Sequence, residues 1–377
     1  MKILIAIGTR PEAIKMAPLI IRLKEILKNN LRVCVTSQHR ELQDEILRLF
    51  KIKPDYDLNI MKNNQSLFDI TINILKKFNQ ILISFKPQLV LVHGDTSTTM
   101  SISLACFYNK IDVGHIESGL RTNNIYDPWP EEVNRKITDL ISVLHFPPTN
   151  IAKQNLKKEN IKSRSLVITG NTVVDSLLIM KDKLLKNDQN RKKYFMKFKF
   201  IKSKFILVTC HRRENFGMGV NELCKAIKII CRNDKNIKFV LPLHPNPNIK
   251  NIIQKKLKDV DGVHLISPLG YASMVYVMMN SYLIFTDSGG IQEEAPSLNK
   301  PILIYRDKTE RPEIIDKGGA ILVKKNTGDI IKKINKLFYS EKIYKKMSMV
   351  NNPYGDGKAT FKIIESIKKL YKQEFNS

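Results

Sequence analysis

Three carboxylates stand within one stretch of the chain, each at the boundary of a predicted strand or helix. Asp95 follows the apolar run 89–92, and Glu117 follows the apolar run 111–116. Glu131 opens the next helical pattern. A lone acid at a strand end is often only a helix cap. Three acids amid glycine, threonine and arginine favour acid–base chemistry at a shared site.

A strand–helix–strand unit is expected to position the first two acids. Residues 98–108, between the two apolar runs, carry apolar side chains at helical spacing. In parallel sheets, ligands bind outside the carboxyl ends of the strands. We therefore predict that the three carboxylates converge on the edge where a doubly wound sheet keeps its site.

Two segments have features that are typical of phosphate binding. The first strand leads through Gly8 into a helix with Pro11 in its first turn, which suits a helix N-terminus that faces an anion. Arg10 and Lys15 lie at or near that terminus, and by themselves we interpret them as solvated surface cations. Neither a G-x-G-x-x-G fingerprint nor a P-loop signature is present.

The stronger phosphate signal lies in the second half of the chain. Ser288, Gly289 and Gly290 follow a predicted strand and precede a helix, so backbone N–H groups can approach an anion. Glu294 lies about one helical turn further on, where it could accept hydrogen bonds from a ribose. Arg311 could add a bidentate contact to phosphate.

Two of the histidines are candidates for a role beside these groups. His211 ends a predicted strand and is followed by two arginines, so it could protonate or hydrogen-bond a leaving phosphate. His244 stands in a similar position. We interpret His93, His115 and His145 as structural, since each lies in an apolar strand context.

Composition narrows the function classes. The 63 basic and 36 acidic residues give a formal net charge of +27. The lysines are spread along the chain, so we predict an anionic substrate and no nucleic-acid partner. We find no HExxH motif or cysteine cluster, and expect neither metal nor cofactor. Buried free thiols are the expected state of Cys34, Cys106, Cys210, Cys224 and Cys231.

Alternating strand and helical patterns in both halves predict an α/β protein with two doubly wound domains and a cleft between them. The predicted domains are 1–175 and 176–360, followed by a C-terminal helix over 361–377, with a charged connection at 180–204. The predicted strands are 2–7, 32–36, 89–92, 111–116, 143–146, 165–168, 205–209, 238–243, 263–267, 282–286 and 301–305. No apolar run approaches the roughly 18 residues of a membrane span, and the chain starts directly with a strand, so we expect a cytoplasmic protein without membrane contact.

Carboxylates on one side and anion-binding groups on the other describe an enzyme that makes or breaks a sugar–phosphate bond. Motifs spread in order along nearly the whole chain carry a more specific resemblance. They are GTRPEAIKMAPL, SQHRELQDEILRLF, PDYDLNIM, LVLVHGDTSTT, VGHIESGLRT, PWPEEVNR, TGNTVVDSL, TCHRRENFG, FTDSGGIQEEAPSL, RDKTERPE and NPYGDGKA. Together they resemble the bacterial non-hydrolysing UDP-N-acetylglucosamine 2-epimerase family.

This resemblance implies a GT-B-like fold, with two Rossmann-like domains and the active site in the cleft between them. It implies an isomerase that reversibly converts UDP-N-acetylglucosamine (UDP-GlcNAc) into UDP-N-acetylmannosamine (UDP-ManNAc). UDP would leave by anti elimination to a 2-acetamidoglucal intermediate and add back on the other face. The product would supply ManNAc units for cell-surface polysaccharide. A homodimer is also implied.

The resemblance also assigns residues. The implied catalytic residues are Asp95, Glu117, Glu131 and His211. The implied substrate-binding residues are Arg10, Lys15, Asp95, Glu117, His211, Leu269, Met274, Ser288, Gly289, Gly290, Glu294 and Arg311. A second UDP-GlcNAc would act as allosteric activator at Gln38, Glu131, Arg212 and His244. The chain departs from its relatives at Leu269 and Met274, where relatives can carry Gln and Phe near the uracil, and at Asn64, where some carry Arg.

Three alternatives remain at this point. A hydrolysing relative would release free ManNAc and UDP from the same intermediate. A GT-B glycosyltransferase would share the segment 288–294 but has no need of three carboxylates, and it would require an acceptor. A sugar-nucleotide sensor would bind UDP-GlcNAc and tolerate loss of the carboxylates. The sequence leaves open which carboxylate removes the C2 proton.

Overall fold

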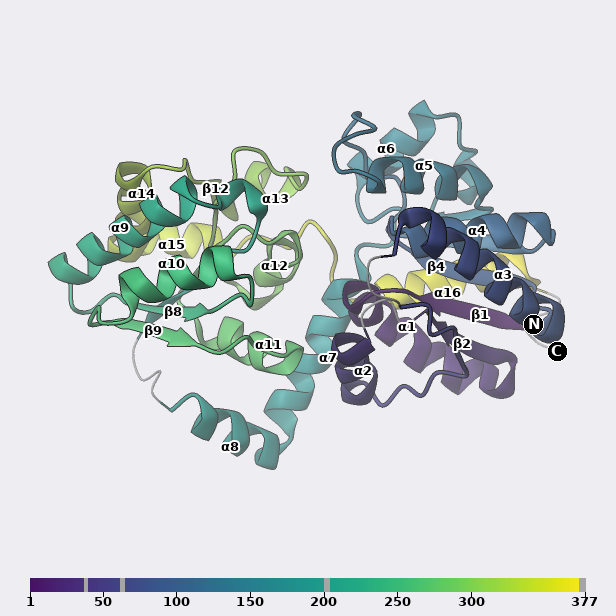
Figure 1. Cartoon of the computed structure of the whole chain (residues 1–377), viewed down its shortest axis with the longest axis horizontal. Helices are drawn as coiled ribbons and strands as arrows, with labels where there is room; N and C mark the ends of the chain where they lie inside the picture. Colours follow the sequence, from purple (N-terminus) through teal and green to yellow (C-terminus); the bar gives the residue numbers. More distant parts are fainter. Residues whose placement is uncertain (37–39, 62–64, 200–203, 373–377) are drawn as a thin grey trace. The chain divides into compact units, whose positions relative to one another are not determined.

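The computed structural model describes residues 1–36, 40–61, 65–199 and 204–372. These residues form two compact units (Figure 1). The first unit contains Met1–Ser176 and the described part of the chain after Pro353, and the second contains Leu177–Pro353. Within the described residues, no helix is long and apolar enough to cross a membrane.

The first unit is built on a parallel six-stranded sheet of order β3-β2-β1-β4-β5-β6. Its strands are β1 (Ile3–Ile7), β2 (Leu31–Val35), β3 (Tyr56–Asp57), β4 (Leu89–His93), β5 (Asp112–Ile116) and β6 (Leu144–Phe146). Its helices are α1 (Arg10–Leu27), α2 (Arg40–Leu49), α3 (Leu67–Phe85), α4 (Ser97–Tyr108), α5 (Glu131–Ile141), α6 (Asn150–Lys158), the start of α7 (Thr172–Lys186), and α16 (Ala359–Leu370). The strand order reverses direction between β1 and β4, which is where doubly wound sheets bind ligands.

Helices cover this sheet because its central strands are apolar on both faces. All five residues of β1 and of β4 are buried, which is typical of parallel strands between two helical layers. Phe78 of α3 and Ile102 of α4 pack against Val90 in one core cluster. Helix α3 starts at a capping box in which Ser66 and Asp69 satisfy each other's backbone N–H groups.

The second unit repeats this architecture, with the parallel order β12-β11-β10-β7-β8-β9. Its strands are β7 (Phe205–Thr209), β8 (Lys238–Pro242), β9 (Val263–Ile266), β10 (Leu283–Thr286), β11 (Ile302–Ile304) and β12 (Ala320–Leu322). Its helices are the rest of α7, then α8 (Asp188–Lys197), α9 (Met218–Asn233), α10 (Pro247–Leu257), α11 (Tyr271–Asn280), α12 (Gly289–Glu294), α13 (Glu313–Asp316), α14 (Thr327–Tyr339) and α15 (Glu341–Ser348). Short 3₁₀ turns occur in both units. The first unit contains η1 (Lys28–Asn30) and η2 (Ser163–Ser165), and the second contains η3 (Arg213–Asn215) and η4 (Ala295–Leu298).

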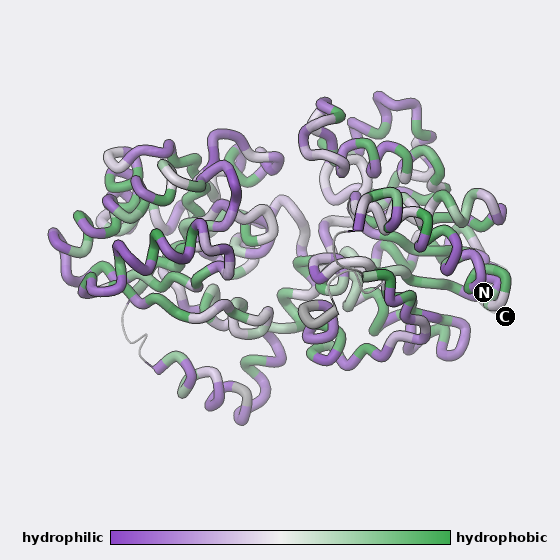
Figure 2. The backbone as a smooth tube through the Cα atoms, in the orientation of Figure 1, coloured by the Kyte–Doolittle hydropathy of each residue, from purple (hydrophilic) through white to green (hydrophobic). Residues whose placement is uncertain are grey.

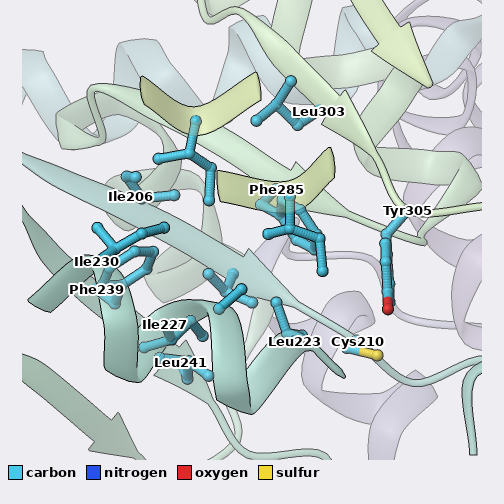
Figure 3. Close-up of a cluster of buried hydrophobic side chains, with 14 of the residues drawn as sticks. Ile206, Cys210, Leu223, Ile227, Ile230, Phe239, Leu241, Phe285, Leu303 and Tyr305 are labelled. Atoms are coloured by element: carbon cyan, nitrogen blue, oxygen red, sulfur yellow. The ribbon is translucent and has the colours of Figure 1, made fainter. Parts of the chain in front are cut away.

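The core of the second unit is continuous from its sheet to the helices packed against it (Figure 3). Phe239 and Phe285 are fully buried among side chains of α9, including Ile227. Tyr305 is also fully buried, and its hydroxyl donates to the carbonyl of Gly219 at 2.8 Å. Figure 2 shows the hydrophobic segments running through the strands of both units. All five cysteines are buried and free, as predicted.

Most predicted strands are confirmed within one or two residues at their ends, but the strand at 165–168 is wrong. Residues Ser163–Ser165 form a 3₁₀ turn, and Leu166 makes only an isolated bridge to His145 beside the edge strand β6. The polar Ser-Arg-Ser sequence favours that turn over an edge strand. The predictions missed the short edge strands β3 and β12.

From Tyr354 on, the described end of the chain belongs to the first unit. The carboxylate of Asp175 accepts the backbone N–H groups of Ala359 at 3.3 Å and Thr360 at 2.9 Å, which caps the start of α16. Helix α16 then packs against α1. The charged connection 180–204 contains the end of α7 and all of α8 within its described part.

Candidate active site

Glu117 is the most tightly held carboxylate of the first unit. It directly follows β5 with a φ of 64°, in the left-handed region that a non-glycine residue adopts only when its surroundings enforce it. Its Oε2 atom accepts from the ammonium group of Lys15 and from the side-chain amide of Asn171. The Nε2 atom of His93 lies 3.7 Å from the same oxygen.

These neighbours keep Glu117 ionised. Burial by itself raises the pKa of a carboxyl group, but the positive charge of Lys15 and the nearby His93 ring hold the pKa of Glu117 well below its ordinary value. Lys15 is therefore not the surface cation that we expected from the sequence, since only 8% of it is exposed. A lysine on α1 finds its partner at the end of β5 because β1, β4 and β5 are neighbours in the sheet.

Asn171 is not among the residues predicted from the sequence, and the prediction for His93 is a structural role. Asn171 caps α7, with its Oδ1 atom accepting from the N–H of Val173 at 3.0 Å, while its amide group donates to Glu117. Its own backbone N–H donates to the carbonyl of Tyr354 at 2.6 Å. His93 is 4% exposed, and neither ring nitrogen makes a hydrogen bond within the described part of the chain.

Asp95 lies in the turn after β4 and is held by α5. The guanidinium group of Arg135 pairs with its carboxylate, and the side-chain amide of Asn134 donates to its backbone carbonyl at 3.0 Å. Glu131 opens the same helix, and its Oε2 atom is buried without a hydrogen-bond partner among the described residues. One helix therefore carries Glu131 and fixes Asp95.

Arg10 begins α1 at the same edge of the sheet. Its Nε atom is buried and makes no hydrogen bond to any residue that the structure describes. The turn before it requires glycine, because a Cβ atom at Gly8 would lie 2.6 Å from the hydroxyl of Thr98. The carboxylate of Glu12 accepts the N–H of Gly8 at 2.6 Å, and burial raises the pKa of Glu12.

The second unit has its own cluster, centred on Asp287, to which the sequence analysis gave no role. Asp287 follows β10 and is fully buried. Its carboxylate accepts the backbone N–H groups of His211 and Arg212, both at 2.9 Å, and the side-chain amide of Asn215 at 2.9 Å. The Nδ1 atom of His211 also lies 3.0 Å from it. Asp287 thereby shapes the loop after β7 and orients the His211 ring.

Asp287 should contribute to stability in a pH-dependent way. Burial raises its pKa, but hydrogen bonds and the charge of His211 outweigh this and lower it to about 2. A carboxylate with a depressed folded pKa stabilises the protein above its unfolded pKa, near 3.9, and loses that contribution as the pH falls toward the folded value. We expect Asp287→Asn to lower the free energy of unfolding at pH 7 by about 2 kcal/mol.

Denaturant unfolding of both proteins at several pH values tests this expectation. The difference in the free energy of unfolding between wild type and Asp287→Asn should become smaller below pH about 4. Asp261→Asn is a control, since that carboxylate lies on the surface, where its pair with Lys235 contributes little. A difference that stayed constant across this pH range would contradict an electrostatic role for Asp287.

An arginine cluster lies beside the glycine turn of the second unit. The guanidinium of Arg311 packs against Gly289, where an added Cβ atom would lie 2.6 Å from its Nη1. Its Nε donates to the buried Glu293 at 2.6 Å. Arg306 and Arg212 lie 3.3 and 3.9 Å from the same carboxylate oxygen of Glu310. Burial, followed by the charge of Arg306, lowers the pKa of Arg212. Sequence analysis missed Arg306.

The remaining predicted residues of this unit surround α11 and α12. Leu269 and Met274 are half-buried on either side of Tyr271, whose hydroxyl donates to Glu294 at 3.0 Å. Ser288 and Gly290 are half-buried beside Gly289. The rings of His211 and His244 stack with centroids 5.7 Å apart, and burial lowers the pKa of His244. Gln38 and Asn64 lie outside the described residues.

The two clusters have complementary chemistry. The first unit presents carboxylates, one of them held as an anion, which can move protons or stabilise positive charge. The second unit presents arginines, a histidine and open backbone, which can bind phosphate groups. Among the described residues, no group of three or more histidine, cysteine or acidic side chains is arranged to hold a metal ion.

Comparisons with known proteins agree on one family. The family model of UDP-N-acetylglucosamine 2-epimerase matches residues 22–368. The UDP-N-acetylglucosamine 2-epimerase of Escherichia coli K12 is 48% identical over 370 residues, which cover 98% of each chain.

Solved structures give the same result. The UDP-GlcNAc 2-epimerase from Neisseria meningitidis, solved with bound UDP-GlcNAc, is 50% identical with a TM-score of 0.90, and the match covers 98% of this chain and 100% of that one. The enzyme from Methanocaldococcus jannaschii, in complex with UDP-GlcNAc and UDP, is 32% identical with a TM-score of 0.81, at 98% and 100% coverage. The two parallel sheets and these neighbours confirm the predicted GT-B-like α/β fold.

Proposed function

The chain belongs to the UDP-N-acetylglucosamine 2-epimerase family, and we propose that it reversibly converts UDP-GlcNAc into UDP-ManNAc without releasing free sugar. The product would supply ManNAc units for cell-surface polysaccharide. We propose that the enzyme acts in the cytoplasm as a homodimer, as the resemblance implies. The catalytic part of this proposal rests on one observation, which is that Glu117 is ionised and held in place by Lys15 and Asn171.

The reaction must break a C–H bond that no adjacent carbonyl acidifies. In the elimination, a base takes the proton from C2, the C–H electrons form the C1=C2 double bond, and UDP leaves C1 with the electrons of the C1–O bond. Re-addition of UDP, with a proton delivered to the other face of C2, completes the epimerisation. Positive character at C1 develops as UDP leaves, and nearby carboxylates stabilise it.

We assign these roles to the first unit. Asp95, Glu117 and Glu131 supply the acid, the base and the charge stabilisation. Glu117 suits a base or a charge-stabilising role, because Lys15 and Asn171 hold it deprotonated and fixed. Glu131 has a buried oxygen without a protein partner among the described residues, and such an oxygen is available to a substrate.

We assign binding of the nucleotide mainly to the second unit. His211 would assist the departing UDP, with its ring oriented by Asp287. Arg311 and the Ser288–Gly290 turn would bind phosphate oxygens, and Glu294 the ribose. The relatives solved with UDP-GlcNAc or UDP support this class of ligand. We assign Arg10 and Lys15 to the substrate as well, through their charge.

We further propose that a second UDP-GlcNAc activates the enzyme. In the second unit, His244 stacks on the ring of His211, the residue before Arg212, and Glu131 belongs to the first unit. The test runs the reverse reaction from UDP-ManNAc with and without a trace of UDP-GlcNAc. An unregulated enzyme would start equally fast in both reactions.

Deuterium exchange at C2 tests the proposed reaction directly. Purified protein is incubated with UDP-GlcNAc in deuterated water, and the sugar is followed by NMR. We expect UDP-ManNAc with deuterium at C2, and deuterium washed into the recovered UDP-GlcNAc. Free ManNAc and UDP would instead identify a hydrolysing enzyme. Bound UDP-GlcNAc without any exchange would contradict catalysis and indicate a sensor.

A further inference from the structure

A buried charge cluster lies behind the proposed catalytic carboxylates and contains none of them. Its centre is Asp139 on α5, which is 1% exposed. One carboxylate oxygen accepts from the Nδ1 atom of His115 at 2.6 Å. The other accepts from the backbone N–H of Gly119 at 3.3 Å and from the guanidinium of Arg121 at 2.7 Å.

Both contacts lead to turns that carry proposed catalytic residues. The second ring nitrogen of His115 lies 2.7 Å from the carbonyl oxygen of Gly94, the residue before Asp95. Gly94 has a φ of +71°, a left-handed conformation that glycine adopts without steric cost. Gly119 lies two residues after Glu117. Asp139 is therefore connected, directly or through His115, to the turns of both Asp95 and Glu117.

The hydrogen-bond partners define the charge of the His115 ring. A backbone carbonyl and a carboxylate only accept, so both ring nitrogens must donate, and the ring is an imidazolium. Burial raises the pKa of Asp139, but His115 and Arg121 outweigh it and lower that pKa to about 2, so Asp139 is its anionic partner.

Charged and titratable neighbours also surround the pair. Arg121 also binds Glu159, with Nε 2.8 Å from Oε1, which balances its charge. His145 faces the pair from β6, and its Nε2 atom lies 2.7 Å from the backbone carbonyl of Asp139, not from the carboxylate. Burial lowers the pKa of His145, so this neighbour stays neutral.

We propose that His115 and Asp139 are positioning residues of the epimerase, a buried hydrogen-bonded pair that fixes the turns of Asp95 and Glu117 relative to each other. The proposal rests on the proposed function. Charge-assisted hydrogen bonds are about twice as strong as neutral ones. The bonds of His115 and Asp139 therefore restrict the movement of these two turns. This restriction affects rate directly, because a displacement of about 1 Å at a reacting group can cost about 10²-fold.

Two single variants and their combination test the proposal. His115→Gln keeps a donor for Gly94 but turns an amide oxygen toward the Asp139 carboxylate. Asp139→Asn removes the anion that the imidazolium needs. We expect each to lower kcat by about 10- to 100-fold, with KM and UDP affinity changed less than about twofold, since the groups assigned to nucleotide binding belong mainly to the second unit.

The double variant should recover part of that loss. In His115→Gln alone, the new amide oxygen faces a carboxylate that has no proton to donate. In the double variant, the same oxygen can accept from the asparagine amide at position 139, while the glutamine amide still donates to Gly94. We therefore expect H115Q/D139N to be at least several-fold faster than the sum of the single effects predicts. A merely additive double variant, or single variants with wild-type kcat, would overturn the proposal.

Two further measurements separate positioning from simple stability. His145→Gln alters a buried histidine that contacts the backbone carbonyl of Asp139 but has no link to Gly94. This variant should therefore lower stability but leave kcat unchanged. NMR of the isotope-labelled wild type, with the His115 ring signals assigned through bonds to its own labelled backbone, should show both ring nitrogens protonated in the folded protein. A neutral ring would overturn the proposal even if the single variants fail to fold.

Failure of the proposed function gives a different pattern. If the wild type incorporates no deuterium at C2, the positioning role falls together with the reaction, but the imidazolium signal of His115 remains. If the wild type exchanges deuterium and the His115 and Asp139 variants exchange it equally fast, only the positioning role is overturned.

Discussion

Glu117→Gln is expected to lower kcat by about 10²- to 10⁴-fold, in both directions of the epimerisation. An amide neither removes a proton nor stabilises positive charge as a carboxylate does. The variant would also place a neutral group against Lys15 and Asn171, the two donors that now hold Glu117. Rates of C2 deuterium exchange and of UDP-ManNAc formation measure the loss.

The interpretation requires that the variant remains folded and binds the nucleotide. UDP affinity, measured by calorimetry, should stay close to that of the wild type, because the groups assigned to phosphate binding belong mainly to the second unit. Glu25→Gln is a matched control, since Glu25 is an exposed glutamate on α1 in a surface pair with Arg22. A Glu117→Gln enzyme with more than about a tenth of wild-type kcat would contradict a role in proton transfer.

The sequence predicts the two sheets and the edge on which the carboxylates lie, because that information is local. An apolar run marks a parallel strand, and the polar residue after the run marks its carboxyl end. Asp95 and Glu117 follow the neighbouring strands β4 and β5, so the predicted strand–helix–strand unit brings their turns to one edge.

The groups that tune those carboxylates are not predictable in this way. Lys15 and Glu117 are 102 residues apart, and Asn171 and Glu117 are 54 residues apart. No local pattern identifies such partners, and an isolated lysine on a helix is more often exposed. His115 is a similar case, since the apolar run around it predicts burial but does not reveal that its ring joins Asp139 to Gly94.

In the second unit, the sequence predicts a phosphate-binding turn at Gly289 and Gly290. The structure shows that Asp287, just before this turn, also has a defined role. Its carboxylate accepts backbone N–H groups from the loop after β7. An acid at a strand end can have many roles. Asp287 can bind the loop after β7 only because β7 and β10 are neighbours in the sheet. The functional residues therefore lie at strand ends, as the sequence predicts, but the role of each residue depends on which strands are neighbours.

Gly289→Ala is expected to weaken UDP binding by about 10- to 100-fold, and the structure gives a steric reason. The new Cβ atom would lie 2.6 Å from Nη1 and 2.8 Å from Cζ of Arg311, so the guanidinium would have to move. It would then lose its contact with the buried Glu293. A guanidinium displaced in this way would lose its proposed contact with a UDP phosphate, and a charge-assisted hydrogen bond is worth about 1.5–3 kcal/mol, which corresponds to this range of affinity.

A double-mutant cycle shows whether the methyl group acts through Arg311. UDP affinity is measured by calorimetry for Gly289→Ala, Arg311→Ala and both together, with Gly328→Ala as control. In α14, a Cβ atom at Gly328 would meet only Asn326, at 3.7 Å, so UDP affinity should not change. Once Arg311 is absent, Gly289→Ala should have little further effect. An equal loss in both backgrounds would mean that the methyl group obstructs the nucleotide itself, so that Gly289 is needed for close backbone approach to phosphate rather than for seating Arg311.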